Sequence, residues 1–183
     1  KGLSGGTIVV RPPMQSPLVA AENTIIGNTV LYGATDGYLF AAGRAGERFA
    51  VRNSGAKVVI EGCGSNGCEY MTGGIAVILG SIGANFGAGM TGGMAYLYDP
   101  DGLAPDRINP ETLVMCPVTV AEWQDELKGL IERHAAETNS VRANEILRNW
   151  DVEKGFFLQI CPKEMLQHLK HPLSLEQDAI PAE

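Results

Sequence analysis

The 183-residue chain is long enough for one medium-sized domain or for a domain with an appendage, and 45% of its residues are apolar. Its charged fraction of 19% is too low for intrinsic disorder, and a net charge of −7 argues against a nucleic-acid-binding surface. No run of 18 apolar residues occurs and the first ten residues lack the layout of a signal peptide, so neither a membrane span nor secretion is expected.

Glycine and charge divide the chain into two parts. Of the 23 glycines, 21 lie in residues 1–102, whereas only 13 charged residues lie there. The change falls in the loop 99–110, which contains an Asp-Gly pair and three prolines. We therefore predict a glycine-rich β domain over residues 1–102 and a helical C-terminal extension with one short strand over residues 103–183.

A ten-residue segment recurs in the first part, at residues 3–12, 34–43, 53–62, 71–80 and 90–99. Its second position always carries a hydroxyl: Ser4, Thr35, Ser54, Thr72 and Thr91. The next two positions are mostly glycine and include Gly37, Gly55, Gly73, Gly74, Gly92 and Gly93. Positions six to eight are apolar in every copy. Copies of this kind indicate one structural unit per repeat.

Small residues before an apolar strand, every 18–19 residues in the last four copies, predict a coil that turns sharply at each pass. Successive strands then stack about 4.8 Å apart, and the hydroxyls stack in line at the corners. The predicted fold class is therefore mainly β, a single-stranded parallel β-helix with a C-terminal α-helical extension. The hydroxyl and glycine residues named above are predicted to be structural corner residues.

The run GCGSNG (residues 62–67) also spells the dinucleotide-binding fingerprint G-x-G-x-x-G. That fingerprint requires a helix to begin at its last glycine, but Gly73 and Gly74 follow within one or two turns. A second match at residues 87–92 also lacks a helical sequence after it. We interpret both matches as corner glycines of the β-helix and not as nucleotide sites.

Position seven of the repeat predicts a second buried face. It holds Val9, Phe40, Val59, Val77 and Tyr96, although strand side chains alternate and positions six and eight already face the interior. A strand that is apolar on both faces is typical of a covered sheet, so the C-terminal segment or a partner should pack here. The alternative is that these residues lie at corners and only touch the surface.

The second part of the chain predicts helices with one strand between them. Thr119 and Glu122 form a capping box before an amphipathic helix that extends to about Glu137. A second helix follows, with an apolar face formed by Val141, Ile146, Leu147 and Trp150. Residues 156–162 predict a strand, and Pro162 should begin a last helix that carries Met165, Leu166 and Leu169. The tail 174–183 is expected to be mobile.

No catalytic set can be assembled from the titratable residues. His134, His168 and His171 are interpreted as surface residues, and Glu61 as solvent-facing, because its column also holds arginine, alanine, leucine and tyrosine. The cysteines, Cys63, Cys68, Cys116 and Cys161, form no CxxC pair, which indicates a reduced, cytoplasmic chain. Cys63 and Cys68 could form half of a metal site, but no second pair accompanies them. We therefore predict no catalytic, cofactor-binding or metal-binding residue.

Residues 46–99 and 130–150 closely resemble the C-terminal GXGXG domain of the glutamate synthase large (alpha) subunit. The resemblance implies a right-handed parallel β-helix. It also implies a parent enzyme that makes two glutamates from glutamine and 2-oxoglutarate, with an amidotransferase domain, an FMN-binding barrel and an iron–sulfur cluster. It further implies that the parent enzyme receives electrons from FAD and NADPH or from ferredoxin. One departure is Gly64-Ser65-Asn66-Gly67, where family members commonly carry Gly-Asp-His-Gly.

The resemblance implies a structural role for this segment. The β-helix would hold the amidotransferase and FMN-barrel domains of the same large subunit in the relation that ammonia channelling requires, with the small (beta) subunit as a further partner. No cofactor, nucleic acid or membrane is expected to bind it. The chain would be truncated within the β-helix, so its first strand should offer an open edge that favours oligomers.

Two other functions are alternatives to this one. The first is a stand-alone β-helix structural subunit, because the chain also resembles such subunits of archaeal glutamate synthase and of formylmethanofuran dehydrogenase. The second is a small-ligand or metal-binding module that uses Cys63 and Cys68.

Overall fold

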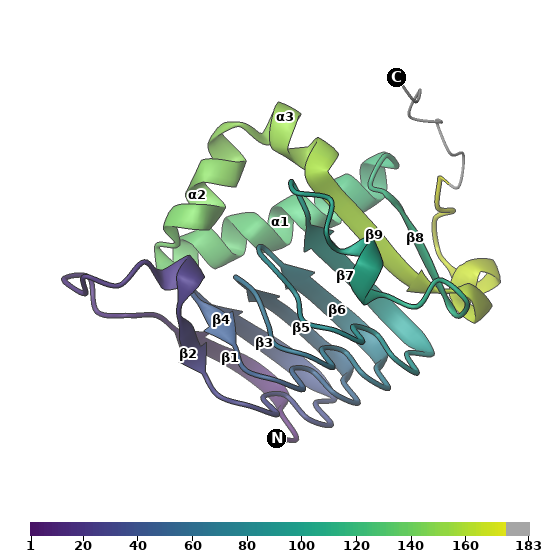
Figure 1. Ribbon diagram of the computed structural model, residues 1–183, viewed down its shortest axis with the longest axis horizontal. Coiled ribbons are helices and arrows are strands. Elements are labelled where there is room, and N and C mark those ends of the chain that lie inside the picture. Colours follow the sequence, from purple (N-terminus) through teal and green to yellow (C-terminus); the bar gives the residue numbers. More distant parts are fainter. Residues whose placement is uncertain (175–183) are drawn as a thin grey trace.

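The computed structural model describes residues 1–174 and shows a parallel β-solenoid of about four turns with helices packed on one face (Figure 1). The solenoid strands are β1 (Ser4–Val10), β3 (Asp36–Ala41), β5 (Ser54–Ile60), β6 (Thr72–Ile78) and β7 (Gly92–Tyr98). Each strand pairs in parallel with the next. The predicted fold class is confirmed, and each strand lies in one copy of the repeat.

The sheet extends beyond the solenoid. Strand β9 (Phe157–Pro162) pairs antiparallel with β7, and β8 (Leu113–Pro117) pairs antiparallel with β9, so the seven-stranded order is β1-β3-β5-β6-β7-β9-β8. The prediction of one strand after residue 102 was therefore wrong, because β8 also belongs to this sheet. A small sheet pairs β2 (Thr24–Ile26) with β4 (Arg44–Ala45). At the other end β1 has a single neighbour, β3, and leaves one edge open.

Helix α1 (Ala121–Thr138) crosses the outer face of the sheet, α2 (Val141–Arg148) packs against α1, and α3 (Trp150–Glu153) leads back to β9 (Figure 1). The short 3-10 helices lie at Ala20–Glu22, Pro105–Arg107, Lys154–Phe156 and Lys163–His168. The predicted helix after Pro162 is thus a 3-10 helix. The predicted mobile tail falls almost wholly on residues 175–183, outside the described part of the chain.

Two cores explain why the strands are apolar on both faces. Positions six and eight of the repeat, such as Val58 and Ile60, fill the solenoid interior. Position seven forms a column on the other face, where Phe40, Val59, Val77 and Tyr96 are direct register neighbours and are fully buried against the helices. Of the two predicted coverings, the C-terminal segment and a partner, the C-terminal segment covers this face, and only Val9 of this column, on β1, remains 39% exposed.

The turn face of the solenoid has a backbone pattern that the sequence did not indicate. Segments 29–33, 48–52, 66–70 and 85–89 stack on one another, with backbone hydrogen bonds between coils such as Arg52 N–H to Glu69 O (2.9 Å) and Tyr70 N–H to Ala88 O (2.9 Å). Alternate residues there have positive φ although most are not glycine: Thr29, Leu31, Arg48, Ala50, Arg52, Asn66, Cys68, Tyr70 and Asn85. A left-handed non-glycine residue costs about 1–2 kcal/mol. The stacked hydrogen bonds of neighbouring coils hold this conformation.

Candidate functional site

The predicted corner residues lie at the start of successive strands. The N–H of Thr35 donates to Leu3 O (2.7 Å), that of Ser54 to Ala34 O (2.8 Å), and that of Thr72 to Asn53 O (2.9 Å). Each acceptor is the residue just before the hydroxyl residue of the preceding coil. The hydroxyl residues of successive coils therefore lie directly above one another. Thr91 continues the series with a bond to Met71 O (2.9 Å).

The corner glycines lie where one coil touches the next. A Cβ on Gly55, Gly73 or Gly92 would lie 2.0–2.3 Å from a carbonyl oxygen of the preceding coil, closer than any real contact. Gly37, Gly74 and Gly93 instead have φ of +99°, +82° and +83°, which L side chains rarely adopt. The geometry fits a structural role for these residues at the corners. How much they contribute to the free energy of unfolding stays a prediction.

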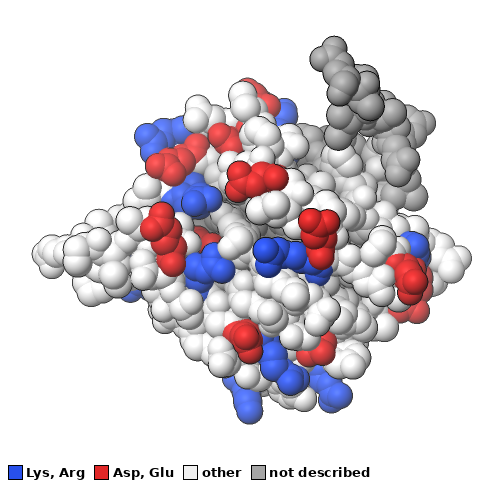
Figure 2. Space-filling view, in the orientation of Figure 1, with Lys and Arg blue, Asp and Glu red and all other residues white. Residues whose placement is uncertain are grey.

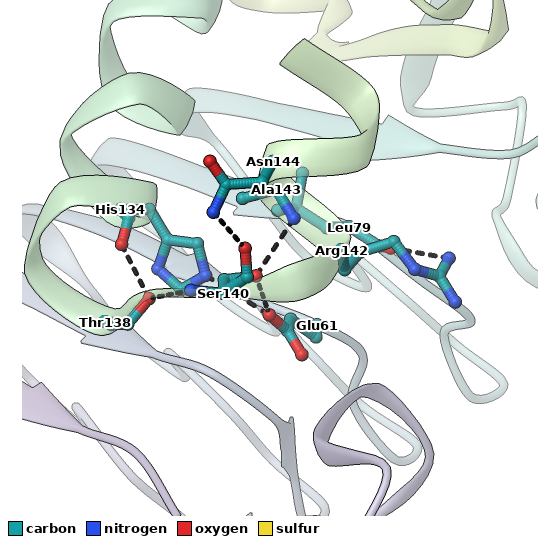
Figure 3. A network of polar contacts seen from close by, with 8 residues as sticks. All are labelled: Glu61, Leu79, His134, Thr138, Ser140, Arg142, Ala143 and Asn144. Carbon is teal, nitrogen blue, oxygen red and sulfur yellow. Dashed lines mark hydrogen bonds and ion pairs between the residues drawn. The ribbon is translucent and has the colours of Figure 1, made fainter. Parts of the chain in front are cut away.

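One buried polar cluster, which we call the elbow cluster, joins the solenoid to the helices (Figure 3). It consists of Glu61, directly after β5, with His134 and Ser140 from the junction of α1 and α2. All three side chains are at most 3% exposed. Ser140 Oγ donates a short hydrogen bond to Glu61 Oε1, and His134 Nε2 lies 3.5 Å from the same oxygen. The predictions of a solvent-facing Glu61 and a surface His134 were therefore wrong. His168 is exposed and His171 partly exposed.

The elbow between the helices is shaped to present Ser140. Asn139 ends α1 in the left-handed conformation, and the Ser140 hydroxyl accepts a hydrogen bond from Ala143 N–H (2.9 Å), which caps α2. Thr138 donates to His134 O (2.6 Å) and accepts from Ser140 N–H (3.2 Å). Ser140 thus stabilises a helix terminus and a buried carboxylate at the same time.

The order of groups in the elbow cluster indicates a structural link and not a nucleophile. In a serine hydrolase the histidine lies between the serine and the acid, so that it can take the hydroxyl proton. Here the carboxylate of Glu61 lies between Ser140 and His134, and the serine donates to it. His134 Nδ1 has no hydrogen-bond partner among the described residues.

Other elements predicted from sequence differ in detail. Helix α1 begins at Ala121 after the N-cap Val120 without a side-chain cap, so the predicted Thr119 capping box was wrong. Val141 is 70% exposed and does not share the buried face of Ile146. Asn53, which the sequence analysis did not identify, is fully buried. Its Oδ1 accepts a hydrogen bond from Ala56 N–H, and its Nδ2 donates one to Ala56 O (both 2.9 Å).

The GCGSNG loop packs tightly against the coils on either side. A Cβ on Gly64 would lie 3.0 Å from Glu47 N, and a Cβ on Gly83 of the next coil would lie 2.3 Å from Ser65 N. The next element after the loop is strand β6, so no helix begins there. This loop therefore offers no helix N-terminus for a pyrophosphate.

The four cysteines are buried and unpaired. Desolvation raises the pKa of Cys63 from 9.0 to about 12, against the opposing effect of Arg44, and it also raises the pKa of Cys68 well above 9.0. Burial also raises the pKa of Cys116 and of Cys161 to about 11. A thiol that stays protonated is a poor metal ligand. Within residues 1–174, no three His, Cys, Asp or Glu side chains are arranged to hold a metal ion.

These thiols predict a loss of stability in alkali. The unfolded chain releases the thiol protons near the ordinary pKa of 9.0, whereas the folded chain retains them. We expect the free energy of unfolding to fall above pH 9 by roughly 1 kcal/mol per buried thiol and pH unit. Urea unfolding between pH 7 and 10 measures this slope. The Cys63→Ala variant should show a shallower slope, and an unchanged slope would contradict the assignment.

Two grooves flank the elbow cluster. One, of about 400 Å³, lies between β4, the loop after β7 and Arg142; the other, of about 430 Å³, lies between segment 11–21 and the start of α2, and Glu61 borders both. Figure 2 shows basic and acidic side chains interspersed around the centre of this face. No helix among residues 1–174 is long and apolar enough to cross a membrane.

Comparison with known proteins identifies relatives along the whole chain. The GXGXG motif family matches residues 1–163. The glutamate synthase (NADPH) large chain of Azospirillum brasilense is 63% identical over 183 residues, which is all of this chain and 12% of that protein. Ferredoxin-dependent glutamate synthase 2 of Synechocystis sp. is 52% identical over 162 residues, 88% of this chain and 10% of that protein.

A third relative is more distant. Glutamate synthase (NADH) of Schizosaccharomyces pombe is 48% identical over 179 residues, 98% of this chain and 8% of that protein. The chain thus spans about a tenth of the length of these relatives.

Proposed function

This chain belongs to the GXGXG motif family, and we propose that it is the non-catalytic structural domain of a glutamate synthase large chain. The observation that carries the proposal is how its buried polar groups are used. Glu61, a carboxylate buried beside a serine and a histidine, ties the solenoid to the helices and activates no nucleophile. The glycine-rich loop is filled by neighbouring coils.

The parent enzyme, in this proposal, forms two glutamates from glutamine and 2-oxoglutarate and serves nitrogen assimilation in the cytoplasm. Its relatives are named for NADPH, NADH and ferredoxin, yet all contain this segment. This supports the proposal that the choice of reductant, and the FMN, the iron–sulfur cluster and any FAD, belong outside this segment. Cys63 and Cys68 support this placement, because both thiols are buried in the solenoid core, where desolvation raises their pKa.

The partners of the domain would be the amidotransferase and FMN-barrel domains of the same chain, with the small (beta) subunit as a further partner. The domain holds them in a fixed relation so that ammonia passes from one to the other. A two-core solenoid suits this task, since both faces of its central strands are packed and the strands cannot slide independently.

The isolated 183-residue chain should show neither glutaminase activity nor glutamate formation from glutamine and 2-oxoglutarate.

In the full-length chain, Leu127→Ala should open a cavity between α1 and the sheet, because Leu127 is fully buried there. We expect the enzyme to release more free ammonia for each glutamate that it forms, and coupled assays measure both products. Val152→Ala, at a site 66% exposed, is the matched control and should leave this ratio unchanged.

Turnover by the isolated chain would contradict the non-catalytic role. Unchanged coupling in the Leu127→Ala enzyme, despite a measured loss of stability, would contradict the role in channelling. A stand-alone subunit, the alternative function, predicts that the 183-residue chain binds separately expressed catalytic domains with no covalent connection.

A further inference from the structure

The first coil of the solenoid is much longer than the others. Ser4 pairs with Asp36, 32 residues later, whereas Ser54 pairs with Gly73, 19 residues later. The additional chain, residues 11–22, leaves the body of the solenoid and projects beside α2 (Figure 1). We call it the projecting loop. Since the shorter coils complete their turns without such a segment, the solenoid itself does not require it.

The projecting loop is apolar where a solvated loop would be polar. No charged residue lies between Arg11 and Glu22. Met14, Leu18 and Val19 are 67%, 54% and 58% exposed, and the projection is almost free of charged atoms in the space-filling view (Figure 2). Groups of exposed large apolar side chains mark interaction surfaces in folded proteins.

The exposed side chains do not stand alone. The groove of about 430 Å³ runs between the projecting loop and the start of α2, and Val141 lines it from the opposite side with 70% of its surface exposed. Val141 was expected on the buried face of its helix, and instead it extends the apolar surface of the loop. Three prolines at positions 12, 13 and 17 restrict the loop backbone, which lowers the entropy cost of binding.

We propose that the projecting loop, with Val141, is the docking surface for another folded domain of the same polypeptide, through an apolar face of that domain. This inference rests on the proposed function. The length of the relatives identifies what docks on the loop. In each of the three relatives, 88–92% of the protein lies outside the matched segment and is covalently joined to it. A covalently joined domain meets the loop at high effective concentration, so a small apolar surface suffices.

Cysteine accessibility tests the proposal. Leu18→Cys, Tyr70→Cys and Val152→Cys each place a thiol at a site that is more than half exposed, and the native cysteines of this segment are buried. Each variant is prepared in the isolated 183-residue chain and in the full-length chain. Its maleimide labelling rate is read by mass spectrometry of the corresponding peptide. We expect the Leu18→Cys rate to fall at least tenfold in the full-length chain, and unchanged thermal unfolding of the isolated variant confirms that it is folded.

The other outcomes separate the two proposals. If Leu18→Cys keeps its rate while Tyr70→Cys or Val152→Cys is protected, the domain packs elsewhere and the docking inference is overturned alone. If all three sites label equally fast in both chains, the domain does not pack on its neighbours and the proposed function also fails. Protection that appears in the isolated chain and increases with its concentration identifies a second copy as the occupant and overturns the inference.

Discussion

Replacing Gly74 with alanine is expected to destabilise the folded chain by about 3 kcal/mol. Gly74 has φ of +82°, and a Cβ there would lie 2.4 Å from the carbonyl oxygen of Ala56 on the neighbouring strand. The strained conformation and the clash act together. Neither can relax locally, because Ala56 is fully buried and held on both sides by Asn53. Urea unfolding of the purified chain measures the change.

Gly129→Ala is the matched control for this substitution. Gly129 lies on the exposed face of α1, and no atom lies within 4 Å of its added Cβ. Alanine should therefore stabilise the chain by about 0.5–1 kcal/mol, through its better helix propensity. Equal effects of the two substitutions, or a Gly74→Ala chain as stable as the original, would show that the corner glycines do not determine the fold.

The corners and strands could be predicted because the information is repeated. Each coil presents the same column of hydroxyl, glycine and apolar residues, so Thr72 and Gly74 have counterparts above and below them in the solenoid. The resemblance of residues 46–99 and 130–150 was confirmed by the family match and by the relatives. The repeat also indicated that the outer face of the sheet is buried, because Val59 and Val77 are apolar residues that recur on that face.

The elbow cluster could not be predicted in this way. The Glu61 carboxylate is buried because Ser140, 79 residues later, closes over it, and a column shared with arginine and tyrosine gives no sign of that contact. The segment TNS (residues 138–140) spans the junction of the two helices. It ends one helix with Asn139 and caps the next with Ser140, and the cap signal was present in the sequence.

Other differences have local causes. Strand β8 is short, ends in proline and pairs only with β9, so its run LVMCP carries little strand signal of its own. The positive φ of Arg48 and Ala50 depends on the hydrogen bonds of the coils on either side. Neither residue type prefers that conformation alone, so no local sequence signal exists for it.

Ser140→Ala should be the most destabilising substitution in the elbow cluster, with an expected loss of about 3 kcal/mol. The hydroxyl does two things that alanine cannot do. It accepts from Ala143 N–H as the N-cap of α2, a bond that contributes about 1 kcal/mol, and it donates to the buried Glu61 carboxylate. Without it, the carboxylate retains only His134 Nε2, at 3.5 Å, among the described side chains. A buried charge that loses its donor is expensive.

Two comparisons separate these contributions, each by urea unfolding. Thr119→Ala removes an exposed hydroxyl that the sequence suggested as a cap and that caps no helix, so its effect should stay within about 0.5 kcal/mol. In the Glu61→Gln background, Ser140→Ala should cost about 1–2 kcal/mol less than in the original chain, because no buried charge is then left without a donor. Strict additivity of the two substitutions would mean that the serine acts only as a helix cap. The hydrogen bond from Ser140 to Glu61 would then add no stability of its own to the junction between the solenoid and the helices.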